Sequence, residues 1–297
     1  MVTTKPPQTL ELRNLAADPA DEWQRLLKFV NLTRADWSAM AESVETLLTR
    51  APELVIGTYD YLLSVPATAA ILGWEQGADE AHLAERRRFF AIWVARTLGM
   101  DTSDEFAHYL FRAGKFHAGH GPRNIHTPPA YITGSIGLVN AAFSQYMQEA
   151  NLSAKVIAGA SAGWNKYLMV QLHLMMLGYT VARELDSGDL SIEVTLYGRL
   201  RNLANRQTIE VHITKDATAK DLLHKFFSYY PQIRDDALDL AWHSKEELDS
   251  LWLVPYPVYT PKKGWRMLIN GHNLSFNGGF DTQLHVDDKI SIFPPGR

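Results

Sequence analysis

Apolar residues recur every three or four positions as far as about residue 186, a spacing that predicts helices. The clearest stripe follows Thr33 and Asp36, which have the spacing of a helix-capping box. It consists of Trp37, Met40, Val44, Leu47 and Leu48. A second helix is expected over about 52–64, ending before Pro66, and further helices over about 79–98, 103–118, 129–150 and 153–185. The pattern therefore predicts an all-α N-terminal region.

Three glycines interrupt the last of these predicted helices: Gly159, Gly163 and Gly178. A glycine inside a helix costs up to about 1 kcal/mol relative to alanine. We therefore expect another helix to pack closely against this one.

The pattern changes at residues 185–189, where turn residues precede an alternation of apolar Ile192, Val194 and Leu196 with polar positions. Strands are expected there and over 208–213, 265–270 and 289–293, with a helix over 217–229. This order predicts an α+β sheet crossed by one helix. The expected organisation is a flexible leader over residues 1–18, a helical domain over 19–187 and an α+β domain over 190–297.

Charge and hydropathy narrow the classes of partner. With 29 Lys and Arg against 33 Asp and Glu, the formal net charge is -4, so no global positive field would attract nucleic acid or an anionic membrane. The most apolar stretch, residues 168–177, is interrupted by Gln171 and His173 and is too short to span a bilayer. The N-terminus has no secretory signal pattern. We expect a cytoplasmic protein with neither a nucleic-acid nor a membrane partner.

The 297 residues include no cysteine, which excludes disulfides, thiolate nucleophiles, cysteine-ligated zinc and iron–sulfur clusters. Histidine is then the main nitrogen ligand for a metal, and His117, His120 and His126 lie within ten positions. Histidines at the C-terminus of a helix are also explained without a metal, because the partial negative charge there favours a protonated imidazole. No third ligand at a suitable offset completes a zinc site, since Glu105 lies twelve residues before His117.

The segment around these histidines resembles the proximal motif of globin-coupled sensors and protoglobins. In that motif a glycine precedes the haem-ligating histidine by three positions, and a second glycine, proline and an aromatic residue follow. The matching residues are Gly114, His117, Gly121, Pro128, Pro129 and Tyr131. The resemblance implies a globin-like fold, haem b as cofactor and His117 as proximal ligand. Because the stretch from His117 to Tyr131 is about three residues longer than the family pattern, His120 and His126 remain alternatives.

The predicted helix over 52–64 resembles the distal helix of the same family. Tyr59 occupies the place of a tyrosine that faces bound gas, and Thr58 stands where phenylalanine is common. By spacing alone, Tyr59 and Tyr61 are equally explained as core residues. The resemblance further implies that Tyr131 lines the pocket.

The distal residue on the helix over 79–98 stays open. His82, Leu83, Arg86 and Phe89 are candidates, and we take Phe89 as a cofactor contact. The run of arginines at 86–88 is within reach of a haem propionate, although such a run is usually a solvated face.

In the resembled family the last two long helices form a homodimer. One stripe on the final helix suits such an interface: Trp164, Tyr167, Leu168, Gln171, Leu172, Met175 and Met176. The alternative is an ordinary core face.

Several short motifs after residue 190 resemble the MoaD/ThiS-type sulfur carriers, which are small ubiquitin-like β-grasp proteins. They are Leu196-Tyr197-Gly198, Ala217-Thr218, Ile269-Asn270-Gly271, Asp287-Asp288 and Ile292-Phe293-Pro294-Pro295. Carriers of this family work through a Gly-Gly tail, whereas this sequence closes on Pro294-Pro295-Gly296-Arg297. We therefore expect a docking domain for a protein partner rather than a carrier, with an insertion over about 233–264.

Together these patterns predict a haem-binding globin that senses O₂, CO or NO and signals through its last helix to the β-grasp domain. A sensor or binding protein is expected rather than an enzyme. The alternative is an accessory or carrier protein in sulfur transfer or molybdopterin-type cofactor biosynthesis, regulated by the globin. Nitric oxide dioxygenation is disfavoured because no flavin or nicotinamide domain is recognisable.

Overall fold

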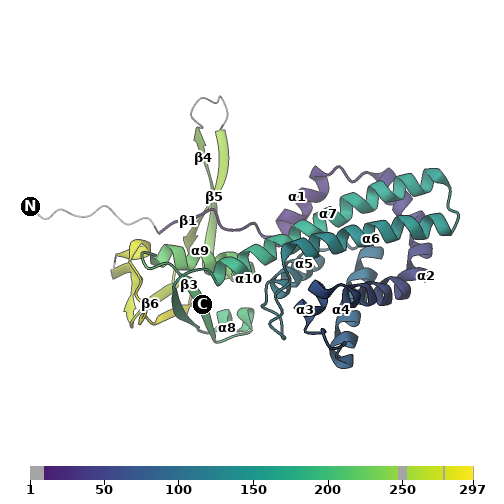
Figure 1. Cartoon of the computed structure of the whole chain (residues 1–297). Coiled ribbons are helices and arrows are strands. Elements are labelled where there is room, and N and C mark those ends of the chain that lie inside the picture. Colours follow the sequence, from purple (N-terminus) through teal and green to yellow (C-terminus); the bar gives the residue numbers. More distant parts are fainter. Residues whose placement is uncertain (1–9, 247–252, 277, 297) are drawn as a thin grey trace, which may run out of the picture. The chain divides into compact units, whose positions relative to one another are not determined.

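The computed structural model describes residues 10–246, 253–276 and 278–296 (Figure 1). The chain divides into two compact units. Residues 18–180 form a helical unit, and residues 10–17 join the described residues from 181 onward in a second unit. The chain therefore passes between the units twice.

The helical unit is built from helices that follow the predicted pattern closely. They are α1 (Pro19–Phe29), α2 (Arg34–Ser64), α3 (Pro66–Leu72), α4 (Glu80–Leu98), α5 (Asp104–His117), α6 (Pro129–Glu149) and α7 (Ala154–Leu185), whose last residues belong to the second unit. Helix α1 was not expected, although Asp18 caps it and Pro19 occupies its first turn. That capping signal was present in the sequence.

Helix α2 differs from the expectation of two separate helices. The capping box of Thr33 and Asp36 is confirmed, and the helix then continues through Pro52 to Ser64. Proline removes one backbone hydrogen bond, but Leu47 and Leu54 on either side are buried in the core. The helix ends before Pro66 as predicted, and α3 begins there.

The apolar stripe on α7 lies inside its own unit. Trp164, Tyr167 and Leu168 are fully buried, and the indole of Trp164 donates to Ser43 Oγ at 2.9 Å. The amide oxygen of Gln171 accepts from the Thr97 hydroxyl at 3.1 Å. The interpretation of this stripe as a dimer face is therefore wrong, because its side chains are used in the intramolecular core.

The glycines of α7 are sites of close helix packing, as expected. A Cβ at Gly163 would lie 2.7 Å from the sulfur of Met40 on α2. A Cβ at Gly178 would lie 1.9 Å from the carbonyl oxygen of Phe111 on α5, and one at Gly114 would lie 1.8 Å from that of Met175 on α7. The backbones of α5 and α7 are thus in direct contact.

The second unit has a five-stranded sheet in the order β3-β2-β8-β6-β7. Its strands are β2 (Leu190–Leu196), β3 (Thr208–Ile213), β6 (Arg266–Ile269), β7 (His272–Asn273) and β8 (Ile290–Phe293). Strands β2 and β8 pair in parallel, and the other neighbours are antiparallel. Helix α9 (Ala219–Tyr229) buries Phe226 and Phe227 in the same core. This is the arrangement of a β-grasp domain, with short helices α8 (Arg199–Ala204) and α10 (Pro231–Ala237).

A second, three-stranded sheet has the order β1-β5-β4, and only β4 and β5 lie within the predicted insertion. It contains β1 (Leu12–Arg13) and the hairpin of β4 (Leu238–Glu246) and β5 (Leu253–Pro261). The prediction of a flexible leader over 1–18 does not describe residues 10–17, because Leu12 is fully buried and pairs with Tyr259. Residues 1–9 and Arg297 lie outside the described residues.

Within the described residues, no single helix is both long and apolar enough to cross a membrane. Helices α2 and α3 together reach the length and apolar composition of a membrane span, but the two helices are bent by 102° relative to each other.

Candidate functional site

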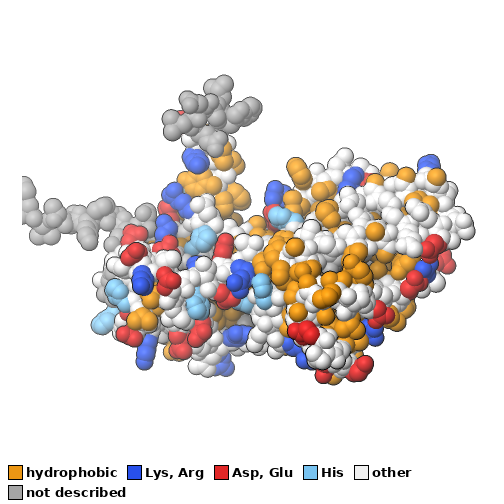
Figure 2. Space-filling model, in the orientation of Figure 1, with side chains coloured by type: hydrophobic (Ala, Val, Ile, Leu, Met, Phe, Trp, Pro, Cys, Tyr) orange, Lys and Arg blue, Asp and Glu red, His pale blue; other side chains and the backbone are white. Residues whose placement is uncertain are grey.

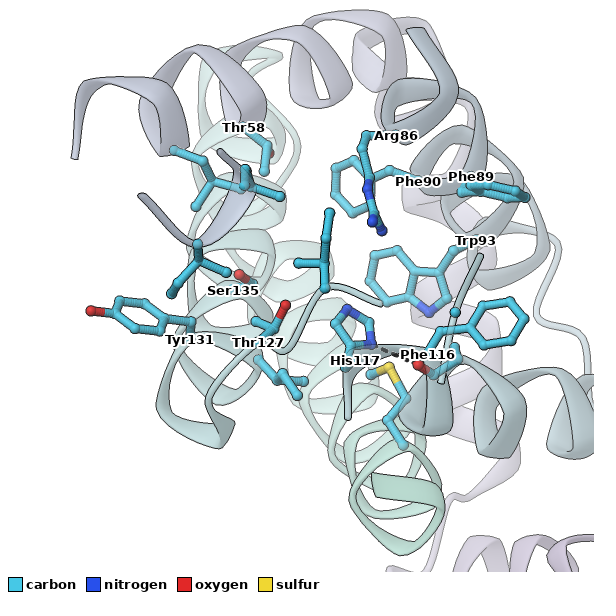
Figure 3. A pocket seen from close by; sticks show the side chains of 18 of the residues that line it. Thr58, Arg86, Phe89, Phe90, Trp93, Phe116, His117, Thr127, Tyr131 and Ser135 are labelled. Carbon is cyan, nitrogen blue, oxygen red and sulfur yellow. Dashed lines mark hydrogen bonds between the residues drawn. The ribbon is translucent and has the colours of Figure 1, made fainter. Parts of the chain in front are cut away.

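A cavity of about 580 Å³ lies among α2, α3, α4, α5 and α6 of the helical unit (Figure 3). This volume is within the range of small-molecule pockets. Most of the side chains that line it are apolar or aromatic, among them Leu62, Ile71, Leu72, Phe90, Trp93, Phe116, Ile125, Ile132, Ile136, Val139 and Met175. Such a lining favours a large and mostly apolar ligand.

His117 is the last residue of α5 and lines this cavity. Its Nδ1 lies 2.8 Å from the carbonyl oxygen of Ala113 and therefore donates the ring proton there. Burial lowers the pKa of His117, and the charge of Arg86 lowers it further. The imidazole is thus neutral, and its Nε2 lone pair is available to a metal.

Backbone contacts on both sides hold His117 in place. Ser103 caps α5, and Gly114 fixes the helix against α7. After the helix, Thr127 donates its backbone N–H to the carbonyl of His117 at 2.7 Å, and Ala118 bridges to His126. The position of the ring is therefore set by packing on α5 and by the returning loop.

Of the three clustered histidines, His117 lines the cavity and the other two do not. The Nε2 of His126 lies 2.6 Å from the hydroxyl of Tyr179. The backbone N–H of His120 donates to Lys115 at the end of the helix. The geometry favours His117 over both alternatives.

Tyr59 on α2 also lines the cavity, whereas Tyr61 is 52% exposed. The Tyr59 hydroxyl donates to the backbone carbonyl of Arg86 at 3.1 Å. Burial raises the pKa of Tyr59 to about 12, so the phenol is neutral and can donate a hydrogen bond.

Helix α4 contributes an aromatic wall. Phe90 meets Tyr59 edge-on, with ring centroids 6.1 Å apart, and stacks on Trp93 at 5.5 Å. Phe89 lines the cavity as well but is 38% exposed. Sequence reasoning missed Phe90 and Trp93, although their spacing from Arg86, at four and seven residues, places all three on one helix face.

Two of the four distal candidates on α4, His82 and Leu83, do not line the cavity. His82 is buried, and the indole of Trp74 lies 3.0 Å from its Nδ1. Burial lowers the pKa of His82. Leu83 belongs to the same small cluster as Trp74.

The side chain of Arg86 extends from α4 into the cavity (Figure 3). Its Nε lies 3.0 Å from His82 Nε2. A neutral imidazole accepts at one nitrogen only, so His82 satisfies either Trp74 or Arg86 at a time. The contact with His82 uses only Nε of Arg86, so the four Nη N–H donors of the guanidinium can bind an anion in the cavity, which Arg112 and Arg123 also line.

Tyr131 lies near the start of α6 and lines the cavity, with its hydroxyl directed away from His117 in Figure 3. Thr127 and Ser135 add hydroxyl groups to the same wall. All four predicted cofactor contacts, His117, Tyr59, Phe89 and Tyr131, thus meet at one cavity.

A bare metal ion has too few ligands in this cavity. Within the part of the chain that the structure describes, no group of three or more His, Cys, Asp or Glu residues is placed to hold a metal. His117 can therefore bind a metal only as one ligand to an ion whose remaining ligands come from another molecule. A porphyrin, with four nitrogen ligands in an apolar disc, matches both this donor and the cavity.

Comparison with known proteins gives two family matches. A model of the Protoglobin family matches residues 20–184, and a model of the ThiS family matches residues 194–296. The predicted succession of an all-α globin-like domain and a β-grasp domain is confirmed. No curated protein matches the chain.

Solved structures with similar folds include the globin domain of a Geobacter sulfurreducens globin-coupled sensor, at 20% identity and a TM-score of 0.42, covering 52% of this chain and 96% of that one. The small archaeal modifier protein 1 of H. volcanii is similar at 19% identity and a TM-score of 0.26, covering 36% of this chain and 100% of that one. The corresponding protein of Methanosarcina acetivorans has 24% identity and a TM-score of 0.27, covering 36% and 93%.

Proposed function

The chain belongs to the protoglobin family, and on that premise we propose that its helical unit binds haem b in the cavity and senses a diatomic gas there. The observation that carries this proposal is His117, a neutral imidazole whose free Nε2 faces an apolar cavity of about 580 Å³. When bound, haem would supply an iron that binds O₂, CO or NO.

His117 is the proposed proximal ligand. The Ala113 carbonyl accepts the Nδ1 proton, which fixes the ring orientation and raises the basicity of Nε2. The side chains of Phe90, Trp93 and Val139 line the same space with mostly apolar surface, which disfavours water there. Phe89 and Tyr131 are proposed as further contacts of the cofactor.

The propionate groups of haem b require cationic partners. Arg86, Arg112 and Arg123 line the cavity and are suited to this role. Arg123 also pairs with Glu85 at 2.8 Å, which holds it at the rim.

Tyr59 is the proposed hydrogen-bond donor to the gas. Its hydroxyl now donates to the Arg86 carbonyl and can rotate to donate to a polar ligand instead. Such a bond stabilises O₂ more than CO, because O₂ becomes the more polar of the two on binding.

The signal is proposed to reach the β-grasp domain through α7, which begins in the helical unit and ends in the second unit. That domain would dock a protein partner. We retain the proposal of a homodimer through α6 and α7, now using the surface that the core leaves free, where Leu138 is 43% and Met169 is 39% exposed.

The alternative proposal is an accessory or carrier protein in sulfur transfer or molybdopterin-type cofactor biosynthesis. The match of residues 194–296 to the ThiS family supports it. It predicts a thiocarboxylate at the C-terminus after incubation with an adenylating enzyme and a sulfur donor, detectable by mass spectrometry.

The absorption spectrum tests the main proposal. Full-length protein reconstituted with haem should show a Soret band that shifts on addition of O₂, CO or NO. His117→Ala should lose the histidine-ligated spectrum, whereas His120→Ala and His126→Ala should retain it. Absence of haem uptake by the wild type would refute the proposal, and an unchanged His117→Ala spectrum would refute the assignment of the ligand.

A further inference from the structure

The hairpin of β4 and β5 presents one open sheet edge. Within the described residues β4 has a ladder partner on one side only, which is β5. Every residue of β4 after Leu238 is exposed, including Leu240 at 51% and Trp242 at 67%. The hairpin projects from the rest of its unit (Figure 1), and hydrophobic side chains gather along its described part (Figure 2).

The pairing with β5 shows which backbone groups of β4 face outward. Lys262 donates its N–H to the carbonyl of Ala237 at 2.9 Å, so these two residues form a hydrogen-bonded pair. Hydrogen-bonded and non-hydrogen-bonded pairs alternate along an antiparallel ladder. The even-numbered residues of β4, from Leu238 to Glu246, are therefore in non-hydrogen-bonded pairs with β5. Their N–H and C=O groups face away from β5, and within the described residues those from Leu240 onward have no ladder partner there. The N–H of Leu238 instead donates to the carbonyl of Arg234 at the end of α10.

The prolines of β5 agree with this assignment and block the opposite edge. Pro255, Pro257 and Pro261 pair with even-numbered residues of β4, where no N–H is needed. Beyond the short pairing with β1, Pro255 and Pro257 leave the outer edge of β5 without two donors. One edge of the hairpin is thus protected from strand addition, and the edge of β4 is not.

We propose that β4 pairs antiparallel with β4 of a second copy of this chain, across a twofold axis at Trp242. In an antiparallel pair of identical strands, the twofold axis lies midway between the two copies of one residue. It cannot lie between two successive residues, because hydrogen-bonded and non-hydrogen-bonded pairs alternate along the ladder. With the axis at Trp242, the outward backbone groups of both strands meet in hydrogen-bonded pairs. Residues 239–245 are then fully paired, and Glu246 meets Leu238 of the partner subunit, whose N–H stays bonded to α10.

Charge complementarity selects this register over its neighbours. In the Trp242 register Asp239 lies opposite Lys245 of the partner subunit, and the contact occurs twice. An axis at Ala241 places Asp239 opposite His243 of the partner subunit instead. An axis at His243 places Leu240 opposite Glu246 of the partner subunit. Opposite charges in directly facing positions stabilise a sheet, and only the Trp242 register supplies them.

This interface is independent of the cavity in the helical unit. The five-stranded sheet of the β-grasp domain is complete without β4 and β5. The base of the hairpin packs on the core of the domain through Leu238 and Tyr259, and the part beyond it adds an interaction surface that the five-stranded sheet does not use. The proposed self-association does not require haem.

Single cysteines test the register in the full-length chain, which has no cysteine of its own. In the Trp242 register the two Cα atoms of residue 242 are about 5.5 Å apart, within the range of a disulfide. Those of residue 241, and likewise of residue 243, are about 8 Å apart and beyond that range. Under mild oxidation Trp242→Cys should form a covalent dimer at least about tenfold faster than Ala241→Cys, His243→Cys or the distant exposed control Lys215→Cys. Faster dimerisation of either neighbour, or equal rates for all four variants, would overturn the proposal.

A charge exchange tests the same contact without a new covalent bond. Asp239→Lys and Lys245→Asp each place like charges opposite one another twice, and should weaken self-association severalfold in sedimentation measurements. The double variant restores opposite charges and should recover the wild-type association. Equal association of the wild type and the single variants, or a double variant no better than the single ones, would refute the interface.

Discussion

Replacing Gly178 by alanine tests whether the direct contact between α5 and α7 positions His117. The added Cβ would lie 1.9 Å from the carbonyl oxygen of Phe111 and 2.8 Å from its carbonyl carbon. Both are backbone atoms, so no side-chain rotation relieves the overlap. The helices would have to separate by roughly 1.5 Å to restore ordinary contact.

The size of the effect follows from two opposing terms. Alanine gains about 1 kcal/mol over glycine in a helix, whereas overpacking costs up to about 3 kcal/mol. The net loss is about 2 kcal/mol, which corresponds to a fall in Tm of about 4–8 °C for a unit of this size. Since His117 follows Phe111 on α5, the same displacement moves Nε2, and haem affinity should fall at least about tenfold.

Thermal unfolding followed by circular dichroism measures the first effect, and haem titration in the Soret region measures the second. Gly57→Ala on α2 is the matched control, because a Cβ there meets nothing within 4 Å. It should raise the free energy of unfolding by up to about 1 kcal/mol and leave haem affinity unchanged. If Gly178→Ala behaved like Gly57→Ala in both measurements, the argument from helix contact would be refuted.

Three further predictions concern the cavity and its helices. Tyr59→Phe should speed O₂ release about tenfold with little effect on CO, as measured by stopped flow, because one hydrogen bond of roughly 1.4 kcal/mol is lost; equal effects on both gases would contradict the proposed donor. Burial lowers the pKa of His117, so haem should stay bound until the pH falls below the ordinary histidine value of about 6.5, where protonation of Nε2 competes with the iron; a Soret titration with a midpoint above that value would oppose it. Burial also lowers the pKa of Lys115 to about 7. Above that pH the unfolded chain keeps a proton that the folded chain releases, so the free energy of unfolding should rise by up to roughly 3.5 kcal/mol between pH 7 and 10 relative to Lys115→Met. Parallel urea-unfolding profiles for the two proteins would show that Lys115 is not desolvated.

Local patterns predicted much of the fold. The capping box at Thr33, the end of α2 before Pro66 and the strand at Thr208–Ile213 are as expected. Each depends on residues close together in the sequence, where capping, the constraint before proline and strand alternation act directly. The glycines of α7 likewise indicated close packing before its partner helix was known.

Other features depended on residues far apart in the sequence. The apolar stripe on α7 gave no sign of whether it faced its own core or a second copy. The buried position of Leu12 requires Tyr259, which lies at the other end of the chain. Phe89 and Phe90 are adjacent and chemically alike, and only the packing of α4 against Tyr59 places Phe90 beside it.

The sequence by itself determined two domains of different secondary structure and a histidine-rich segment between predicted helices as the candidate metal site. Which of His117, His120 and His126 lines the cavity was decided by tertiary structure alone. It depends on where α5 ends against α7 and on how the loop to Thr127 returns to the carbonyl of His117. Spacing fixes the positions of side chains along a helix, but only long-range packing determines which of them faces a cavity.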